Sequence, residues 1–95
     1  MTLSELRALK PQIMEIAARY GVYDIRVFGS VARGDADEDS DVDLFLEGFK
    51  GSLLRFASFK TQLEDLLGHS VDIRERQHIR HPMVWESMLK DMKPL

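Results

Sequence analysis

The sequence contains no cysteine, so the chain can form no internal disulfide, no thiolate zinc site and no cysteine nucleophile. It also lacks any segment long and apolar enough to span a membrane. The opening residues, MTLSELRALK, have none of the apolar core that is typical of a signal peptide. From these absences we expect a cytoplasmic location and no association with a membrane.

The sequence also lacks a large excess of charge of either sign. It has 13 basic and 16 acidic residues, which give a net charge of −3. Non-specific binding to nucleic acid depends on an excess of positive charge. We therefore expect no direct binding to DNA or RNA.

No repeat, low-complexity run or linker divides the chain. Its 95 residues, of which 44% are hydrophobic, are enough for one compact domain. We therefore expect a single domain over residues 1–95. A chain this short buries only a modest fraction of its surface, which favours association in a homo- or hetero-oligomer.

The first twenty residues have a helical pattern. Thr2 and Glu5 have the spacing of a capping box at a helix start, and Gly21 can end the helix. The apolar stripe consists of Leu6, Leu9, Ile13, Ile16, Ala17 and Tyr20. Pro11 is unfavourable inside a helix because it removes a hydrogen bond and clashes with the preceding turn. We therefore expect a short first turn and then a main helix from about Pro11 to Tyr20.

The second half of the chain predicts two helices and a strand. The elements are a loop from Gly48 to Ser52, a helix from Leu53 to Leu67 ended by Gly68, a strand from Ser70 to Arg74, and a helix from Met83 to Met92 with Pro82 near its first turn. The first of these helices would bury Leu63, Leu66 and Leu67 against a sheet.

Two aspartates stand out in the middle of the chain. Asp41 and Asp43 alternate with aliphatic residues, so a strand here would place both carboxylates on one face. An isolated Asp-x-Asp is more often a pair of solvent-facing charges. Two adjacent anions are nevertheless costly to hold together unless a cation joins them, and oxygen ligands suit Mg²⁺ or Mn²⁺. Since Mg²⁺ takes one or two carboxylates and completes its shell with phosphates and waters, the pair indicates a phosphate ligand.

The residues before this pair predict a place for that phosphate. Tyr23 to Phe28 is typical of a strand, and Gly29 and Ser30 permit a sharp turn into a short helical stretch from Val31 to Arg33. Backbone N–H groups at such a start, with the Ser30 hydroxyl, favour an anion. Arg33 would add forked donors toward phosphate oxygens, although an exposed arginine needs no functional explanation. Alone, Gly29 and Ser30 are more typical of a structural turn.

A P-loop is excluded. Gly29 and Gly34 have the spacing of the two glycines in that motif, but Asp35 stands where its lysine would be. The cation that would meet the phosphates is therefore missing. The acids between Asp35 and Asp39 are better interpreted as a solvated loop that leads into the second strand.

The combined pattern resembles a known signature. Gly29-Ser30-x-Ala32-Arg33-Gly34, followed by Ser40-Asp41-x-Asp43-Leu44, is similar to the motif of the DNA polymerase β-like nucleotidyltransferase superfamily, and within it to the minimal nucleotidyltransferases of bacteria and archaea. The resemblance covers nearly the whole chain. It implies an α/β (α+β) fold, with a small mixed sheet packed by helices.

The same resemblance implies roles for the acidic residues. The family has a third carboxylate on a later strand, and Asp72 in the segment SVDIR fits that position. Asp41 and Asp43 would bind the metals, two Mg²⁺ ions with Mn²⁺ as a substitute. Asp72 would bind the catalytic metal and help to remove the proton of the acceptor hydroxyl, which is the logic of two-metal catalysis. Gly29, Ser30 and Arg33 would hold the nucleotide.

The resemblance also implies a reaction and a partner. In the minimal family the partner is typically a HEPN-domain toxin, and transfer of AMP from ATP to a tyrosine hydroxyl of that toxin makes the small protein its antitoxin. One alternative is an antitoxin that neutralises a HEPN protein by docking, with little or no catalysis. A second is nucleotidyl transfer to a small molecule, which is disfavoured because no second domain is evident to hold it.

The C-terminal stretch is more basic than the centre. One interpretation is a solvated helix that packs Trp85, Met88 and Leu89 onto the sheet. The other is a docking surface for an acidic partner, formed by Arg76, Arg80 and Lys90. The three histidines, His69, His78 and His81, have no convincing metal spacing, and we assign none of them to a site.

Overall fold

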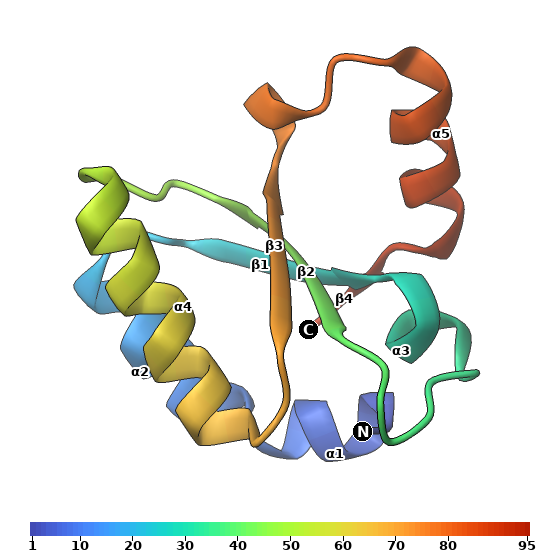
Figure 1. Ribbon diagram of the computed structural model, residues 1–95, viewed down its shortest axis with the longest axis horizontal. Helices are drawn as coiled ribbons and strands as arrows, with labels where there is room; N and C mark the ends of the chain where they lie inside the picture. The colour runs from blue at the N-terminus through green and yellow to red at the C-terminus, as the bar shows by residue number, and fades with distance from the viewer.

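A four-stranded mixed sheet in the order β3-β2-β1-β4 forms the centre of the computed structural model, which describes residues 1–95 (Figure 1). The strands are β1 (Asp24–Phe28), β2 (Val42–Glu47), β3 (Val71–Glu75) and β4 (Lys93–Pro94). Strand β2 runs parallel to β3, while β1 is antiparallel to both of its neighbours. The predicted small mixed sheet is thus confirmed.

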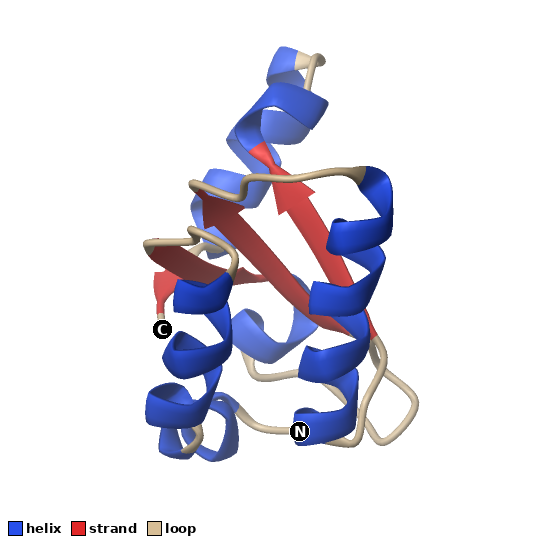
Figure 2. Cartoon of the chain, turned by 90° about the vertical axis from the view of Figure 1, so that its left-hand side faces the viewer, coloured by secondary structure: helices blue, strands red, loops and turns tan.

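Helices lie on both sides of this sheet. They are α1 (Leu3–Ala8), α2 (Lys10–Arg19), α3 (Gly29–Arg33), α4 (Leu53–Leu67) and α5 (Pro82–Asp91), with a short 3-10 turn at Arg76–His78. Figure 2 shows α2 and α4 side by side in front of the strands. In Figure 1, α3 and α5 lie on the opposite side from that pair. None of these helices is long and apolar enough to cross a membrane.

Successive side chains along each strand point to opposite faces of the sheet. Val42, Leu44 and Leu46 of β2 are buried in the main hydrophobic core. The same core contains Ile25 and Val27 of β1, Val71 and Ile73 of β3, and Ile13, Ala17, Phe59, Leu63 and Leu67 of α2 and α4. Side chains between the core residues must point to the other side of the sheet because the strand period is two. That other side, which carries Asp43, Phe45, Asp72 and Arg74, is called the open face below.

The predicted helix boundaries are largely confirmed. The capping box is present, since the Glu5 N–H donates to Thr2 Oγ1 at 3.1 Å and the Thr2 N–H donates to Glu5 Oε1 at 3.1 Å. Pro11 stands in the first turn of α2, where its missing N–H costs nothing. Helix α4 has the predicted limits and ends at Gly68 in the left-handed conformation. Leu66 is only partly buried, however, and the fully buried residue of α4 that the pattern missed is Phe59.

Strand β4 was not predicted. Lys93 and Pro94 pair with Val27 and Arg26 of β1, and Arg7 Nη2 donates to the Pro94 carbonyl oxygen at 2.7 Å. Leu95 is buried in the core. This pairing returns the chain after α5 to the sheet and thereby fixes where α5 ends.

Helix α5 is held by a few aromatic and ionic contacts. None of its residues is buried. Trp85 packs on Phe45 of the open face, with ring centroids 5.4 Å apart, and the Arg76 guanidinium lies 4.4 Å from the Trp85 ring centroid. Met88 is partly buried and Leu89 is exposed. Helix α5 therefore leaves space between itself and the sheet.

Candidate active site

Two of the three predicted carboxylates are neighbours on the open face. Asp43 and Asp72 occupy the same register position of the parallel pair β2 and β3. Adjacent strands are about 4.8 Å apart, so the two side chains leave the sheet next to each other. Phe28, the last residue of β1, is opposite Asp43 on the other side of β2. The sheet topology thus brings together residues that are 29 positions apart (43 and 72).

Asp41 lies just outside the strand. The sequence pattern placed it within a strand, but β2 begins at Val42 and Asp41 is exposed. Its charge nevertheless reaches Asp43, because it is one of the groups that raise the pKa of that carboxyl. Asp41 is therefore a carboxylate at the rim of the site.

The ionised form of Asp43 is destabilised. Partial burial first, then the neighbouring charges of Asp72 and Asp41, raise the pKa of Asp43 to about 6. The positive charges of Arg33 and Arg74 oppose this effect without cancelling it. An excess of negative charge thus gathers at one point of the open face, where a cation would be stabilised.

Gly29 makes room for the Asp43 carboxylate. Its φ of +70° is in the left-handed region. A Cβ at this position would overlap Asp43 Oδ2 and lie 2.9 Å from its Cγ. Glycine is therefore required at position 29 for two reasons, the left-handed backbone conformation and the close approach of the Asp43 side chain. The predicted Gly-Ser turn and the predicted Asp-x-Asp pair are in direct contact.

The turn that follows is short and well defined. Helix α3 begins at Gly29, two residues earlier than the predicted helical stretch, and Ser30 lies in its first turn. The Ser30 carbonyl oxygen accepts from the N–H groups of Gly34 and Asp35, at 2.9 and 3.0 Å. Gly34 then ends the helix with a φ of +86°. Ser30 is thus held beside the Gly29 and Asp43 contact.

Arg33 already has partners within the chain. Its Nη1 lies 3.0 Å from Asp91 Oδ2, and its Nε lies 3.2 Å from Asp35 Oδ2. These hydrogen bonds, with Asp91 the larger contributor, raise the pKa of Arg33 above its ordinary value. The guanidinium therefore connects α3 to α5, and a phosphate at Arg33 would compete with Asp91 and Asp35.

Arg74 is a site residue that the sequence interpretation missed. It is on the open face two residues after Asp72, and its Nε lies 3.3 Å from Asp72 Oδ2. The available signal was the strand alternation in SVDIR, which places Asp72 and Arg74 on one face. Arg74 holds the Asp72 carboxylate by a charge-assisted hydrogen bond.

The donor set fits a divalent cation that arrives with phosphate. No three carboxylate or imidazole groups are close enough together to form a metal site by themselves. Asp43 and Asp72 supply hard oxygen donors side by side, with Asp41 at the rim. Mg²⁺ commonly uses one or two carboxylates and takes its remaining ligands from water and substrate phosphates. This pair suits such a shared site better than a closed all-protein site.

A groove of about 450 Å³ adjoins Asp72 between the open face and α5. Its lining consists of Phe28, Asp72, Arg74, His78, Ile79, Arg80, His81, Val84 and Met88. Residues from β1, β3, the loop after the 3-10 turn and α5 thus meet around one space. We call this space the Asp72 groove.

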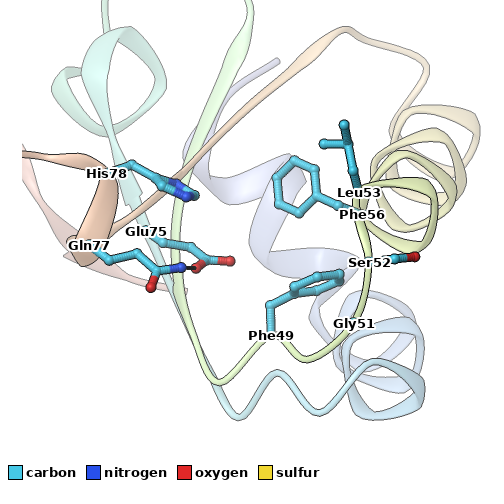
Figure 3. A pocket seen from close by; sticks show the side chains of 8 residues that line it. All are labelled: Phe49, Gly51, Ser52, Leu53, Phe56, Glu75, Gln77 and His78. Carbon is cyan, nitrogen blue, oxygen red and sulfur yellow. Dashed lines mark hydrogen bonds between the residues drawn. The ribbon is translucent and has the colours of Figure 1, made fainter.

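A second pocket, of about 310 Å³, contains none of the predicted site residues. Figure 3 shows the rings of Phe49 and Phe56 on one side of it, with Glu75 and Gln77 on the other. Gln77 Nε2 donates to Glu75 Oε2 at 2.7 Å, which gives the buried carboxylate a partner. Glu75 and Gln77 of this pocket are thus already paired with each other.

Comparison with known proteins agrees with this geometry. The nucleotidyltransferase domain family matches residues 9–94. The protein adenylyltransferase MntA of Thermococcus cleftensis is 44% identical over 77% of this chain and 76% of its own length. A candidate protein adenylyltransferase of Methanocaldococcus jannaschii, MJ0126, is 34% identical over 96% and 95%.

Solved structures share the fold. A protein described as a candidate minimal nucleotidyltransferase superimposes with a TM-score of 0.81 and 44% identity, over 100% of this chain and 97% of that one. A toxin-antitoxin structure with AMP-PNP has a TM-score of 0.71 at 16% identity, over 90% and 70% of the two chains, which shows a common fold. On these matches, the chain belongs to the nucleotidyltransferase domain family and, within it, to the minimal nucleotidyltransferases.

Proposed function

We propose that this protein transfers AMP from ATP to a tyrosine hydroxyl of a HEPN-domain toxin and acts as its antitoxin. The observation that carries the proposal is the adjacency of Asp43 and Asp72 on the open face, with Gly29 in contact with Asp43. Relatives named as protein adenylyltransferases support AMP transfer to a protein. A fold shared with a toxin-antitoxin structure that contains AMP-PNP supports both the nucleotide and the type of partner.

The chain's own residues would hold the nucleotide at one end of the open face. Asp41 and Asp43 would bind Mg²⁺, or Mn²⁺ in its place, together with phosphate oxygens, and Asp72 would bind the catalytic ion. Ser30 and the main chain at Gly29 would contact the same phosphates, with Arg33 as a further donor. When bound, the two metal ions supply charge neutralisation at the phosphates and lower the pKa of the acceptor hydroxyl.

The proposed reaction forms one bond and breaks another, both at the α-phosphorus of ATP. The acceptor oxygen forms a bond to the α-phosphorus of ATP, and the bond from that phosphorus to the oxygen bridging to the β-phosphate breaks. Pyrophosphate leaves with the electron pair of the broken bond. The proton of the acceptor hydroxyl passes to Asp72, whose carboxylate is oriented by Arg74 at 3.3 Å.

Mass spectrometry of the partner tests the proposal. The protein is incubated with ATP, Mg²⁺ and the HEPN-domain product of the adjacent gene, and the partner should gain the mass of one AMP on a tyrosine. Asp43→Asn should abolish the gain, whereas Asp65→Asn, an exposed carboxylate of α4, should not. A stable complex that neutralises the toxin without a mass change would show an antitoxin that acts by docking. Transfer only to a small molecule would overturn the choice of acceptor.

A further inference from the structure

We infer that the Asp72 groove receives an acidic polypeptide segment of the acceptor protein and guides its hydroxyl-bearing side chain to Asp72. This inference rests on the proposed function, because it names where the acceptor of that reaction binds. It adds a docking surface and the chemistry of the segment that this surface would recognise.

The groove lies where the acceptor must approach the nucleotide. Gly29 opens α3 and contacts Asp43, so phosphate groups held at these residues would lie on the α3 side of the site. In-line transfer requires the acceptor oxygen to approach opposite the departing pyrophosphate. The Asp72 carboxylate is next to Asp43 across the parallel strands, and it is the one carboxylate that lines the groove. The groove is thus a path by which a side chain can reach the reacting atoms.

The walls of the groove suit a polypeptide. Figure 1 shows the connection from β3 to α5 arching above the sheet, so that α5 stands apart from β3. Ile79, Val84 and Met88 give the groove an apolar side, and Val84 is 51% exposed. A volume of about 450 Å³ is enough for one or two large side chains of a bound segment. An aromatic side chain would find apolar contact along this wall.

The charges of the groove predict an acidic segment. The chain as a whole is acidic, with a net charge of −3, yet two arginines, Arg74 and Arg80, line this one space against a single carboxylate, Asp72. Arg74 is partly neutralised by Asp72, whereas none of the five ion pairs in the chain involves Arg80. Arg80 is therefore the cation that remains available to a ligand. Complementary charge of this kind acts on association rate and on the choice of partner.

The other two basic residues of the predicted docking surface have different places. Arg76 lies over the Trp85 ring at 4.4 Å and donates through Nη1 to the Ile79 carbonyl oxygen at 2.7 Å. Its guanidinium connects the segment after β3 to α5 and does not line the groove, so reversing its charge would disturb the fold of this segment. Lys90 is exposed on α5 and does not line the groove. Of the three basic residues that were predicted to contact an acidic partner, only Arg80 both lines the groove and has no partner within the chain.

A binding experiment with synthetic peptides tests the inference without requiring catalysis. The first probe is a short labelled peptide with one tyrosine between two pairs of glutamates, and the second has lysines in place of the glutamates. Fluorescence anisotropy measures their affinity for the full chain, and a separate titration measures ATP with Mg²⁺. The variants are Arg80→Gln and Arg80→Glu. The control is Lys10→Glu, an exposed charge reversal on α2, which packs on the other side of the sheet.

The acidic peptide should bind more tightly than the basic one. Its affinity should fall about threefold in Arg80→Gln and about tenfold in Arg80→Glu, and it should be unchanged in Lys10→Glu. ATP affinity should stay within about twofold in all variants. A peptide with photoreactive benzoylphenylalanine in place of tyrosine should cross-link to Met88 or Val84.

Four results would overturn the inference, three from the titrations and one from the cross-linking. Those from the titrations are no preference for the acidic peptide, equal peptide affinity in Arg80→Glu and Lys10→Glu, or a loss of ATP binding in Arg80→Glu, which would show a nucleotide site. Cross-links found only on α2 or α4 would also overturn it, because these helices lie on the other face of the sheet from the groove. If the peptide binds as expected but AMP transfer to the partner fails, the docking surface stands and the proposed reaction is wrong.

Discussion

The Asp43 carboxylate lies against Gly29, so that a Cβ on residue 29 would overlap Asp43 Oδ2. Gly29→Ala should therefore displace this carboxylate in addition to straining a backbone with a φ of +70°. We expect a loss of about 2–4 kcal/mol in the free energy of unfolding, from left-handed strain and overpacking together. Binding of ATP with Mg²⁺ should weaken at least tenfold, about 1.4 kcal/mol.

Gly68 provides a matched control for this substitution. It has the same φ of +70°, but a Cβ there would meet nothing within 4 Å. Gly68→Ala should cost about 1–2 kcal/mol in unfolding free energy, from strain alone. Chemical denaturation measures both losses and calorimetry measures nucleotide binding. Equal effects of the two substitutions on nucleotide binding would show that the contact between Gly29 and Asp43 has no part in the site.

Asp43→Asn should stabilise the metal-free protein in a pH-dependent manner. The pKa of Asp43 is raised from 3.8 to about 6 in the folded chain, so the folded state holds this proton more tightly than the unfolded state. Asp43 therefore contributes stability below about pH 4, and that contribution is lost as the pH rises through 6. Asparagine does not ionise and avoids the loss.

The expected gain at pH 7.5 is about 1 kcal/mol after allowance for the solvent that screens this half-buried carboxyl. For a domain of this size it corresponds to a rise of about 4–8 °C in Tm. The gain should shrink as the pH falls toward 4. Thermal melts in EDTA across this pH range measure it, with Asp65→Asn as the control. A gain that is independent of pH would show that repulsion among the carboxylates is not its cause.

Asp72→Asn should impair chemistry more than nucleotide binding. If Asp72 accepts the proton of the acceptor hydroxyl, its loss should lower the single-turnover rate of AMP transfer by about two to four orders of magnitude. ATP affinity should change by less than about threefold, since Asp41 and Asp43 remain. Arg74→Gln, which keeps Asp72 but removes its 3.3 Å partner, should have a smaller effect on the same rate. A large loss of ATP affinity with an unchanged rate at saturation would reassign Asp72 to nucleotide binding.

Much of this architecture is encoded locally and could be predicted. The limits of α4 follow from the Ser52 cap and the left-handed Gly68, both of which act within one turn of the helix. The alternation of apolar and polar residues around Asp43 and around Asp72 predicted that each carboxylate points away from the apolar face of its own strand. The adjacency of these two strands came from the family resemblance, because no local pattern specifies which strands pair.

Other features depend on contacts distant in sequence. Strand β4 has two residues, one of them proline, and no alternation, so only the path of α5 determines its pairing with β1. Arg33 was predicted as a supporting donor to phosphate, but the direction of its side chain could not be read from the sequence, because its partner Asp91 is 58 residues away and no periodicity connects them. The solvated helix that was one interpretation of the C-terminal stretch is present as α5, but Leu89, which was expected to pack onto the sheet, is exposed.

The ion pair between Arg33 and Asp91 gives the last prediction. Arg33 cannot serve a phosphate fully while its Nη1 is bound to Asp91 at 3.0 Å. Asp91→Asn should therefore raise the affinity for ATP with Mg²⁺ by about two- to fivefold, because the substitution removes a competing charge. Arg33→Ala should lower it by about tenfold or more, the usual effect of losing a charge-assisted hydrogen bond. Arg19→Ala, which breaks the exposed ion pair with Glu15 on α2, is the control and should change nothing. Isothermal titration of the three variants decides between two roles for Arg33. If all three bind ATP as the unmodified chain does, Arg33 only connects α3 to α5, and the phosphate is held by Gly29, Ser30 and the carboxylates without it.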